Sequence, residues 1–446
     1  MEQQHMFTNR MIRNLLVPVV LEQILNSIMG TADTMMVSNV GSAALSAVSL
    51  VDSINVLLIQ AFSALAAGGA IVCAQYIGQR NYEKANMSAR QVLFIITAIS
   101  VVVSAVCLIF QKPLLRLIFG AVDADVMRAS EIYFFFTALS FPFIAAYDSA
   151  ASIFRAQENT KGPMTISMIS NIMNIGGNAV LIWVFHLGVA GAAISTLVSR
   201  IFCAVVVLWQ LRKDRQPVVV RDYLKIRPDW SMIGRILGLG IPSGIENSMF
   251  QLGKLAIQST VSTLGTAAIA AQAMTNILEN LNGIAAIGVG VGLMTIVGQC
   301  LGAGRKDEAV YYIKKLCVIA EAIIIVSCLI VYILVRPVTI LGGMESTSAE
   351  MCIYMITWIT IVKPVVWTMA FVPGYGLRAA GDVKFSMITS CCTMWACRFC
   401  LCVFLIRVLG FGPMGVWIGM FADWTVRGII FTWRFHSRKW LEHKVI

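Results

Sequence analysis

The chain uses one stretch of sequence twice: residues 18–41 read PVVLEQILNSIMGTADTMMVSNVG, and residues 242–265 read PSGIENSMFQLGKLAIQSTVSTLG. A shift of 224 positions aligns the two, and the alignment continues without a gap to residues 85 and 309, with 15 identities in 68 positions. Composition alone would give roughly half that number in a chain so rich in Ala, Gly and Leu. The repeat therefore predicts two homologous halves.

The composition indicates a membrane protein. Of 446 residues, 58% are hydrophobic and only 13% are charged, which is too little polar surface to cover a soluble core. Apolar runs recur that are long enough to cross a bilayer as helices. We expect an all-α membrane protein with twelve transmembrane helices, near 14–39, 44–74, 91–111, 130–153, 163–185, 189–211, 234–263, 267–300, 314–335, 352–375, 385–407 and 414–433.

The distribution of basic residues predicts the topology. With a cytoplasmic amino terminus, the inside loops and termini hold 24 of the 34 Lys and Arg residues, and the outside loops hold five. Lys and Arg are enriched in cytoplasmic loops, so we expect a multi-pass protein of the plasma (inner) membrane with both termini in the cytoplasm. The formal charge of +11 is thus a topology signal, and we expect no nucleic-acid partner.

Six predicted helices separate corresponding positions of the repeat, so the two halves insert with the same orientation. We expect two six-helix lobes related by a pseudo-twofold along the membrane normal, an arrangement that places a substrate cavity between the lobes. The expected boundaries are an N-terminal lobe at 1–211, a cytoplasmic linker at 212–231 and a C-terminal lobe at 232–446.

Three polar side chains lie at one predicted depth. Asp33 precedes the outer end of the first helix by eight residues, Asn178 precedes the end of the fifth by eight, and Thr196 follows the start of the sixth by eight. Each lies about 12 Å below the outer surface. Oxygen ligands of this kind suit a proton or Na⁺. The alternative is an interior carboxylate that stabilises helix packing, but intramembrane acids more often serve function.

Polar faces on the first, seventh and eighth helices are candidates for the lining of the substrate cavity. Their acids outnumber Lys254, which favours cationic cargo, although Glu246 or Glu279 could instead neutralise Lys254. The candidate residues are Glu22, Asn26, Glu246, Asn247, Gln251, Lys254, Gln258, Asn276 and Glu279.

Other intramembrane charges are expected to be structural. Asp423 and Arg427 stand at i and i+4, a spacing that predicts a local ion pair. Mutual pairing is expected for most of the rest, but the sequence does not identify the partners of Asp52, Asp148, Arg200, Glu321, Lys363 and Arg398.

The chain resembles the multidrug and toxic compound extrusion (MATE) family over essentially its whole length. The resemblance rests on ADTMMVSNVGSAALSAVSL (32–50), VCAQYIGQRNYEKA (72–85), SIFRAQENTKGPMTISMISNIMN (152–174), GIPSGIENSMFQLGKL (240–255), VGQCLGAGRKDEA (297–309) and DWTVRGIIFTWRF (423–435). It implies a V-shaped pair of lobes that alternate access, driven by proton or Na⁺ entry.

The resemblance also implies a cation site. Asp33, Asn174, Asn178 and Thr196 stand where the family places an Asp in the first helix, an Asn and an Asp in the fifth, and a Thr in the sixth. Asn178 departs from the pattern, because it replaces the second acid. In some relatives the C-terminal lobe pairs two acids, but residues 351–377 contain none.

Together these features predict a cation-coupled antiporter that exports amphipathic, cationic organic compounds. Its expected partners are the lipid bilayer and small organic cations. We expect a monomer, no enzymatic activity, no cofactor beyond a coupling H⁺ or Na⁺, and no metal site other than Na⁺ at Asp33. The alternative within the superfamily is a flippase for lipid-linked oligosaccharides, which would need a strongly cationic cavity for pyrophosphate.

Three other classes fit the sequence less well. A directly ATP-driven pump would need a phosphate-binding loop of the form GxxxxGK[ST], which the sequence lacks. An intramembrane enzyme would need a catalytic cluster, yet the four histidines lie at span ends or termini. A channel would not require a repeated two-lobe layout with buried titratable groups.

Overall fold

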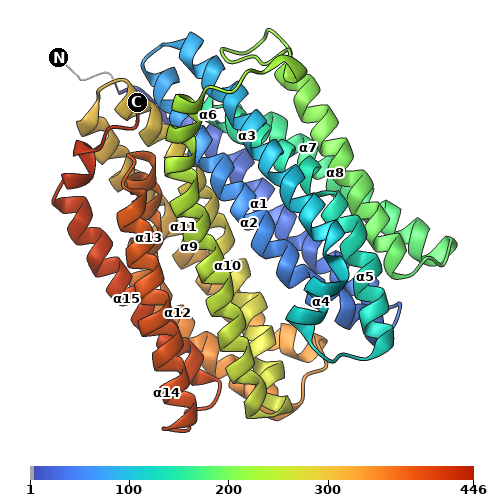
Figure 1. Cartoon of the computed structure of the whole chain (residues 1–446). Coiled ribbons are helices and arrows are strands. Elements are labelled where there is room, and N and C mark those ends of the chain that lie inside the picture. The colour runs from blue at the N-terminus through green and yellow to red at the C-terminus, as the bar shows by residue number, and fades with distance from the viewer. Residues whose placement is uncertain (1–4) are drawn as a thin grey trace. The chain divides into compact units, whose positions relative to one another are not determined.

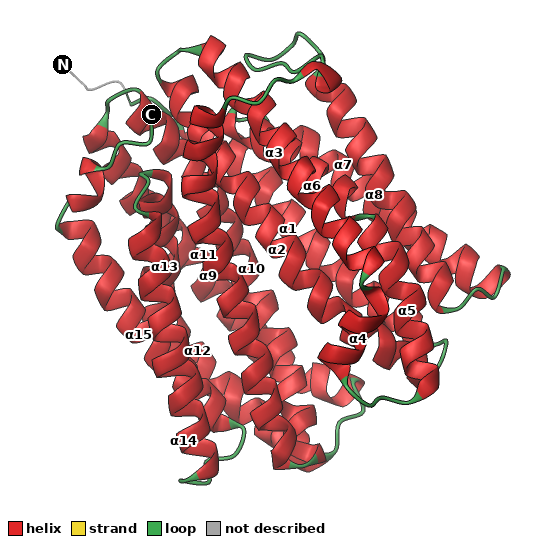
Figure 2. Ribbon diagram, in the orientation of Figure 1, coloured by secondary structure: helices red, strands yellow, loops and turns green. Residues whose placement is uncertain are grey.

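A computed structural model describes residues 5–446 and confirms the all-α class, because this part of the chain contains helices and no strand (Figure 2). Figure 1 labels the α-helices. In chain order the elements are α1 (Asn9–Ser38), α2 (Ser42–Gly78), α3 (Tyr82–Ile109), α4 (Gln111–Phe119), α5 (Ala124–Leu139), α6 (Phe141–Ala156), α7 (Lys161–Asn178), the π-helix η1 (Ala179–Val184), α8 (Val189–Leu211), η2 (Tyr223–Lys225), α9 (Trp230–Val261), η3 (Ser262–Leu264), α10 (Thr266–Gly302), α11 (Lys306–Leu341), α12 (Ser346–Ala379), α13 (Val383–Cys392), the π-helix η4 (Thr393–Cys400), α14 (Leu401–Arg407), α15 (Met414–His436) and η5 (Lys439–Glu442).

Each of the twelve predicted spans falls on one helix or on two or three consecutive helical elements. By length and hydropathy, nine helices of the described chain are apolar enough to cross a membrane, or ten if the bent pair α5 and α6 forms one span. The other two predicted spans lie on α9 and α15, which have 32 and 23 residues. Their polar and charged side chains, such as Lys254 and Asp423, lower their mean hydropathy.

The predicted fourth span differs from a straight helix. It forms α5 and α6, which meet at an angle of 41°. Pro142 lies in the first turn of α6 and has no N–H to continue the hydrogen bonding of α5. The sequence reading also missed the short helix α4.

The internal repeat is visible in the helix boundaries. The helices α2 and α10 each have 37 residues and begin 224 positions apart. Gly41 and Gly265, which precede them, have φ values of 143° and 93°, conformations that glycine adopts without steric cost. Arg80 and Gly304, just after the two helices, both have positive φ. Corresponding sequences therefore fold into corresponding local structures.

The chain forms two compact units. One consists of residues 1–24 and 245–445, and the other of residues 25–244 together with residue 446. These limits cut across α1 and α9, whereas the sequence assigned each helix whole to the half 1–211 or 232–446. We call the units the C-terminal unit and the N-terminal unit. The functional lobes themselves remain a prediction.

Close helix contacts explain why α1 and α9 each contribute to both units. In the C-terminal unit, a Cβ on Gly292 of α10 would lie 2.4 Å from Leu16 of α1. In the N-terminal unit, a Cβ on Gly68 of α2 would lie 2.6 Å from the backbone nitrogen of Gly240 in α9. Gly68 and Gly292 are equivalent in the repeat, so both halves use the same close approach.

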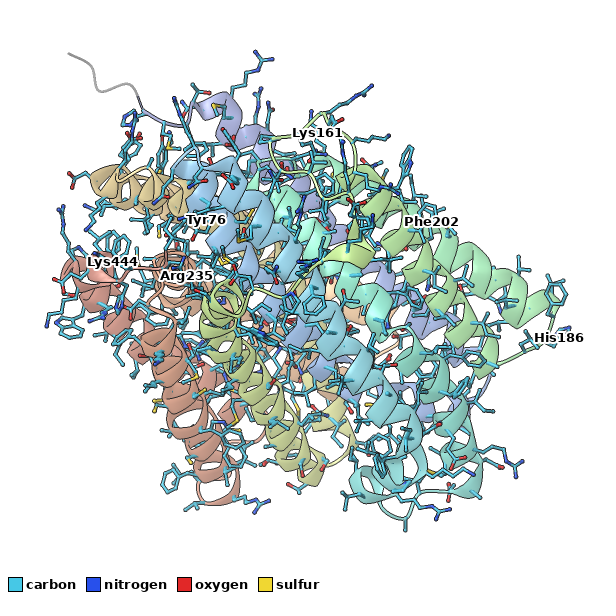
Figure 3. The ribbon with its side chains drawn as sticks, turned by 45° about the horizontal axis from the view of Figure 1, so that its top comes forward. Tyr76, Lys161, His186, Phe202, Arg235 and Lys444 are labelled. Atoms are coloured by element: carbon cyan, nitrogen blue, oxygen red, sulfur yellow. The ribbon has the colours of Figure 1, made fainter. Side chains whose placement is uncertain are left out.

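The segment between α8 and α9 packs on the N-terminal unit. The backbone N–H of Val219 donates to Asn86 Oδ1 at 2.7 Å, and Gln91 binds the segment through both ends of its amide. Arg235, one turn into α9, donates to the Tyr76 hydroxyl at 2.5 Å (Figure 3). The predicted linker is therefore folded against α3, and the start of α9 contacts α2.

The Gly68 contact yields a test of this packing. We expect Gly68→Ala to lower the free energy of unfolding by about 1–3 kcal/mol, because the added methyl meets helix backbone that has no rotamer to change. Gly234→Ala is the control. Gly234 lies on α9, the helix that Gly68 contacts, and nothing lies within 4 Å of its added methyl. Thermal unfolding of the purified variants in detergent measures the difference. Equal melting temperatures would contradict the close packing.

Candidate functional site

The predicted cation-site residues come together in the N-terminal unit. Asp33 lies on the second half of α1, Asn174 and Asn178 on the last turns of α7, and Thr196 on α8. Asn178 Nδ2 donates to Asp33 Oδ1 at 2.6 Å. The helices α7 and α8 run side by side (Figure 1). Ser195 of α8 donates its hydroxyl to the carbonyl of Asn174 at 2.8 Å and fixes their register.

The Asn174 carboxamide lies between Asp33 and Thr196. With its nitrogen toward Asp33, it donates to Asp33 Oδ1 at 2.6 Å and accepts from the Thr196 hydroxyl at 3.3 Å. With its oxygen toward Asp33, it accepts from Asn178 Nδ2 at 3.2 Å instead. In that second orientation two acceptor oxygens would face each other at 2.6 Å, so the orientation with the nitrogen toward Asp33 is the one that satisfies both groups.

The side-chain oxygen of Asn178, which contacts Asp33 through its amide nitrogen, can accept a further hydrogen bond or a cation. Asn178 is buried, and its Oδ1 has no hydrogen-bond partner in the described chain. A buried oxygen without a donor is costly, so it marks a place for a proton donor or a cation. The π-helix η1 starts directly after Asn178, and π-helical segments often accompany functional sites.

The polar face of α7 continues along α1. Asn26 Oδ1 accepts hydrogen bonds from the Ser167 hydroxyl and from Asn171 Nδ2, both at 2.8 Å. Side-chain amides of α7 therefore contact α1 at two levels, at Asn26 and at Asp33. Asn26, assigned to the substrate cavity from sequence, belongs to this polar interface within the N-terminal unit.

A second polar network lies in the N-terminal unit, and the sequence did not resolve it. Asp52 accepts from Asn55 at 3.2 Å and from the Tyr133 hydroxyl at 3.1 Å. Arg200 donates to the Ser140 hydroxyl at 2.7 Å and interacts electrostatically with Asp33 and Asp52. Arg200 therefore links this network to the predicted cation site through its charge.

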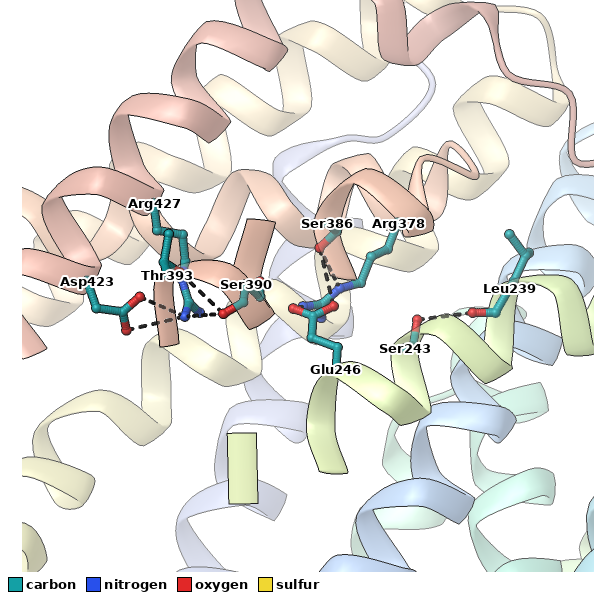
Figure 4. Close-up of polar contacts among 9 residues, drawn as sticks. All are labelled: Leu239, Ser243, Glu246, Arg378, Ser386, Ser390, Thr393, Asp423 and Arg427. Carbon is teal, nitrogen blue, oxygen red and sulfur yellow. Dashed lines mark hydrogen bonds and ion pairs between the residues drawn. The ribbon is translucent and has the colours of Figure 1, made fainter. Parts of the chain in front are cut away.

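The two candidate acids of the C-terminal unit have basic partners other than Lys254. Glu246 accepts from Arg378 Nη2 at 2.6 Å (Figure 4). Glu279 pairs with Lys363 at 2.6 Å, and the Lys363 side chain is fully buried. Neither acid lies within ion-pair distance of Lys254 in the described chain, so neither forms the direct pair with Lys254 that the sequence left open. Arg378 and Lys363 lie on α12, which the sequence could not place against α9 and α10.

The expected ion pair between Asp423 and Arg427 is confirmed. Arg427 Nη2 lies 2.9 Å from Asp423 Oδ1, and Arg427 also contacts Thr393 and Ser390 (Figure 4). Arg398 of η4 lies 3.3 Å from Asp423 Oδ2. One carboxylate therefore serves two buried guanidinium groups.

The remaining candidates lie in different surroundings. Glu22 is buried, Asn247 and Gln251 are half-buried, and Lys254 and Gln258 are exposed. Asn276 Oδ1 accepts from Gln272 Nε2 at 3.3 Å. The roles of these residues in a substrate path remain predictions.

Among residues 5–446, no group of three or more His, Cys, Asp or Glu side chains could hold a metal ion.

A groove in the C-terminal unit lies away from the candidate residues. This groove of about 630 Å³ lies between α11, α12 and α15, with Glu321 and Lys314 among apolar side chains. None of the residues assigned to the cation site or the cavity lines it.

Known proteins match this chain along nearly its full length. The sequence profile described as MatE matches residues 18–180 and 242–404, one match in each half of the repeat. The chain is 27% identical over 438 residues to "Uncharacterized transporter YisQ" of Bacillus subtilis (strain 168), covering 95% of this chain and 93% of that protein. It is 24% identical to "Probable multidrug resistance protein NorM" of Thermotoga maritima, covering 97% and 93%.

The fold also matches solved structures. The chain superimposes on an outward-facing conformation of a multidrug resistance MATE family transporter with a TM-score of 0.88. The two share 19% sequence identity, and the match covers 96% of each chain. At this identity, the comparison supports the fold of the chain.

Proposed function

The chain belongs to the MatE family of multidrug efflux transporters, and from this premise we propose that it exports amphipathic organic compounds in exchange for a proton or Na⁺ bound at Asp33. It is a multi-pass membrane transporter and not an enzyme. The observation that carries the proposal is the contact of Asp33 Oδ1 with both Asn178 and Asn174, each at 2.6 Å.

The geometry supports binding of a small cation at Asp33. A proton would bind a carboxylate oxygen of Asp33, and Na⁺ would be coordinated by the carboxylate and by amide and hydroxyl oxygens. Either ion neutralises the carboxylate inside the membrane, where an uncompensated charge costs several kcal/mol. Ion binding therefore changes the relative stability of conformations that cover or expose Asp33, which is the requirement for coupling.

The charge of the cargo needs a separate argument. The expectation of cationic cargo rested on Glu22, Glu246 and Glu279 outnumbering Lys254. Because Glu246 and Glu279 are paired with Arg378 and Lys363, they add no net negative charge. We therefore retain the class of amphipathic organic compounds and leave cationic cargo without support from these two acids.

The location, oligomeric state and topology of the transporter are part of the proposal. We propose that it works as a monomer in the plasma membrane, with both termini in the cytoplasm, as the distribution of Lys and Arg predicts. Two lobes would alternate access to a cavity between them. The oligosaccharide flippase is the less favoured alternative, because relatives such as the Thermotoga maritima protein carry the name of multidrug resistance proteins.

Transport under imposed gradients tests the proposal. Purified protein is reconstituted into vesicles, the membrane potential is clamped, and export of organic dyes is followed under either a pH gradient or a Na⁺ gradient. We expect one gradient to drive accumulation up to about 10-fold above the no-gradient level for each ion exchanged per compound, since a tenfold gradient supplies about 1.4 kcal/mol per ion. Dissipating that gradient with a protonophore, or replacing Na⁺ with choline, should stop export. Export that ignores both gradients would overturn ion coupling.

A further inference from the structure

Positive charge is in excess at one place inside the C-terminal unit. Glu279 interacts electrostatically with Lys254, Lys363 and Arg398. Arg398 interacts in turn with Asp423, which also pairs with Arg427. This connected group contains four cations and two carboxylates, so its net charge is +2. We call it the cation cluster, and it comprises Lys254, Lys363, Arg398, Arg427, Glu279 and Asp423.

The excess charge is concentrated on Lys254 and Arg398. Lys254 has no carboxylate within ion-pair distance in residues 5–446, and Arg398 shares its single carboxylate with Arg427. The Lys254 ammonium lies 4.9 Å and the Arg398 guanidinium 5.0 Å from the centre of the same Phe250 ring. Two partly compensated cations therefore flank one aromatic side chain.

Arg398 is buried against Asp423. Its side chain is 3% exposed, and its Nε lies 3.3 Å from Asp423 Oδ2 without the geometry of a hydrogen bond. It belongs to η4, a π-helix within the eleventh predicted span, as η1 lies within the fifth. The Arg398 charge is therefore compensated by a carboxylate that Arg427 also uses, and no hydrogen bond orients its Nε.

A membrane interior makes an unbalanced charge of this size unfavourable. Charged groups at membrane depth are retained where they meet a partner, water or a substrate. Lys254 is exposed on α9, whereas Lys363 is fully buried and Arg398 nearly so. An anion can thus reach the cluster at Lys254, with the charge of Arg398 behind it.

We propose that Lys254, supported by Arg398, binds an acidic group of the exported compound, a carboxylate or a sulfonate. The inference rests on the proposed export of organic compounds and names a chemical class within it. One accessible ammonium matches a monovalent anion, because a pyrophosphate would need several exposed cations around it. Half-buried Asn247 and Gln251, on the same helix, supply polar neighbours for such a group.

Three matched probes test this assignment. They are 2-naphthoate, 2-naphthamide and 2-naphthylmethylammonium, which share an aromatic body and carry a negative, zero and positive charge. Binding to the purified full chain in lipid nanodiscs is measured by equilibrium dialysis, without any ion gradient. We expect 2-naphthoate to bind at least about 10-fold more tightly than 2-naphthamide, as a charge-assisted contact of modest strength gives.

Substitutions of Lys254 test whether the preference for 2-naphthoate arises at the cation cluster. Lys254→Gln should reduce the ratio between 2-naphthoate and 2-naphthamide to near one, whereas Lys254→Arg should retain most of it. Lys225→Gln, which removes the same charge from the exposed segment between α8 and α9, should leave the ratio unchanged. Lys254 is exposed, so its replacement leaves the core intact.

Several outcomes would overturn the assignment. Tighter binding of the ammonium probe, or a carboxylate preference that persists in Lys254→Gln, would exclude an acid site at Lys254. Stronger displacement of 2-naphthoate by inorganic pyrophosphate than by benzoate would point to a phosphate ligand instead. Because no gradient is present, these results are independent of ion coupling: loss of gradient-driven export would refute the proposed function, and loss of the carboxylate preference would refute this site.

Discussion

Ion-driven export is expected to fall by about 100-fold in the Asp33→Asn variant, while the protein still inserts into the membrane and folds. Asparagine has the shape of aspartate and retains polar contacts with Asn174 and Asn178, but it cannot exchange a proton or give Na⁺ a charged ligand. Export driven by the coupling gradient in reconstituted vesicles, normalised to the amount of folded protein, measures the effect.

Asp52→Asn is the matched control for this prediction. Asp52 is also an intramembrane acid of the N-terminal unit, but Asn55 and Tyr133 already donate to its carboxylate. We expect the Asp52 variant to keep its dependence on the gradient even if it is less stable. Normal gradient-driven export in Asp33→Asn would refute the coupling role of Asp33.

The fold was predictable from sequence because the signals are local or repeated. Hydropathy indicates helices along the chain, and the repeat aligns each residue of α2 with one residue of α10. The bend between α5 and α6 was missed, since Pro142 interrupts a helix without interrupting its hydropathy. The division of α1 and α9 between the two units was also not predicted. Contacts such as that of Gly68 with Gly240 depend on which helices are neighbours, and the sequence does not show this.

The proximity of the candidate cation-site residues was predictable for a related reason. Asp33, Asn178 and Thr196 lie at equal depth, and depth can be counted along a helix of known rise. The ion pairs of the C-terminal unit could not be found in this way. Lys363 and Glu279 also lie within the membrane, but depth does not indicate which helices are neighbours. The i, i+4 pair of Asp423 and Arg427, by contrast, has a signal within one helix.

The pair of half-buried Glu279 and fully buried Lys363 gives the largest expected change in stability. Glu279→Gln should lower the free energy of unfolding by about 3–5 kcal/mol, because it removes one of the two carboxylates that compensate four cations. Lys363→Met should cost less, about 1–3 kcal/mol, since Glu279 keeps electrostatic contact with Lys254 and Arg398. The methionine also fills the fully buried space beside Trp367.

The order of these two effects is the decisive observation. An isolated ion pair would make the variants similarly unstable, whereas a cluster with excess positive charge makes loss of the acid more harmful than loss of the base. The double variant, Glu279→Gln with Lys363→Met, restores the original net charge and should lie closer to Lys363→Met than to Glu279→Gln. Thermal unfolding of the three purified proteins in one detergent compares them. A Lys363→Met protein less stable than Glu279→Gln would contradict the excess of positive charge.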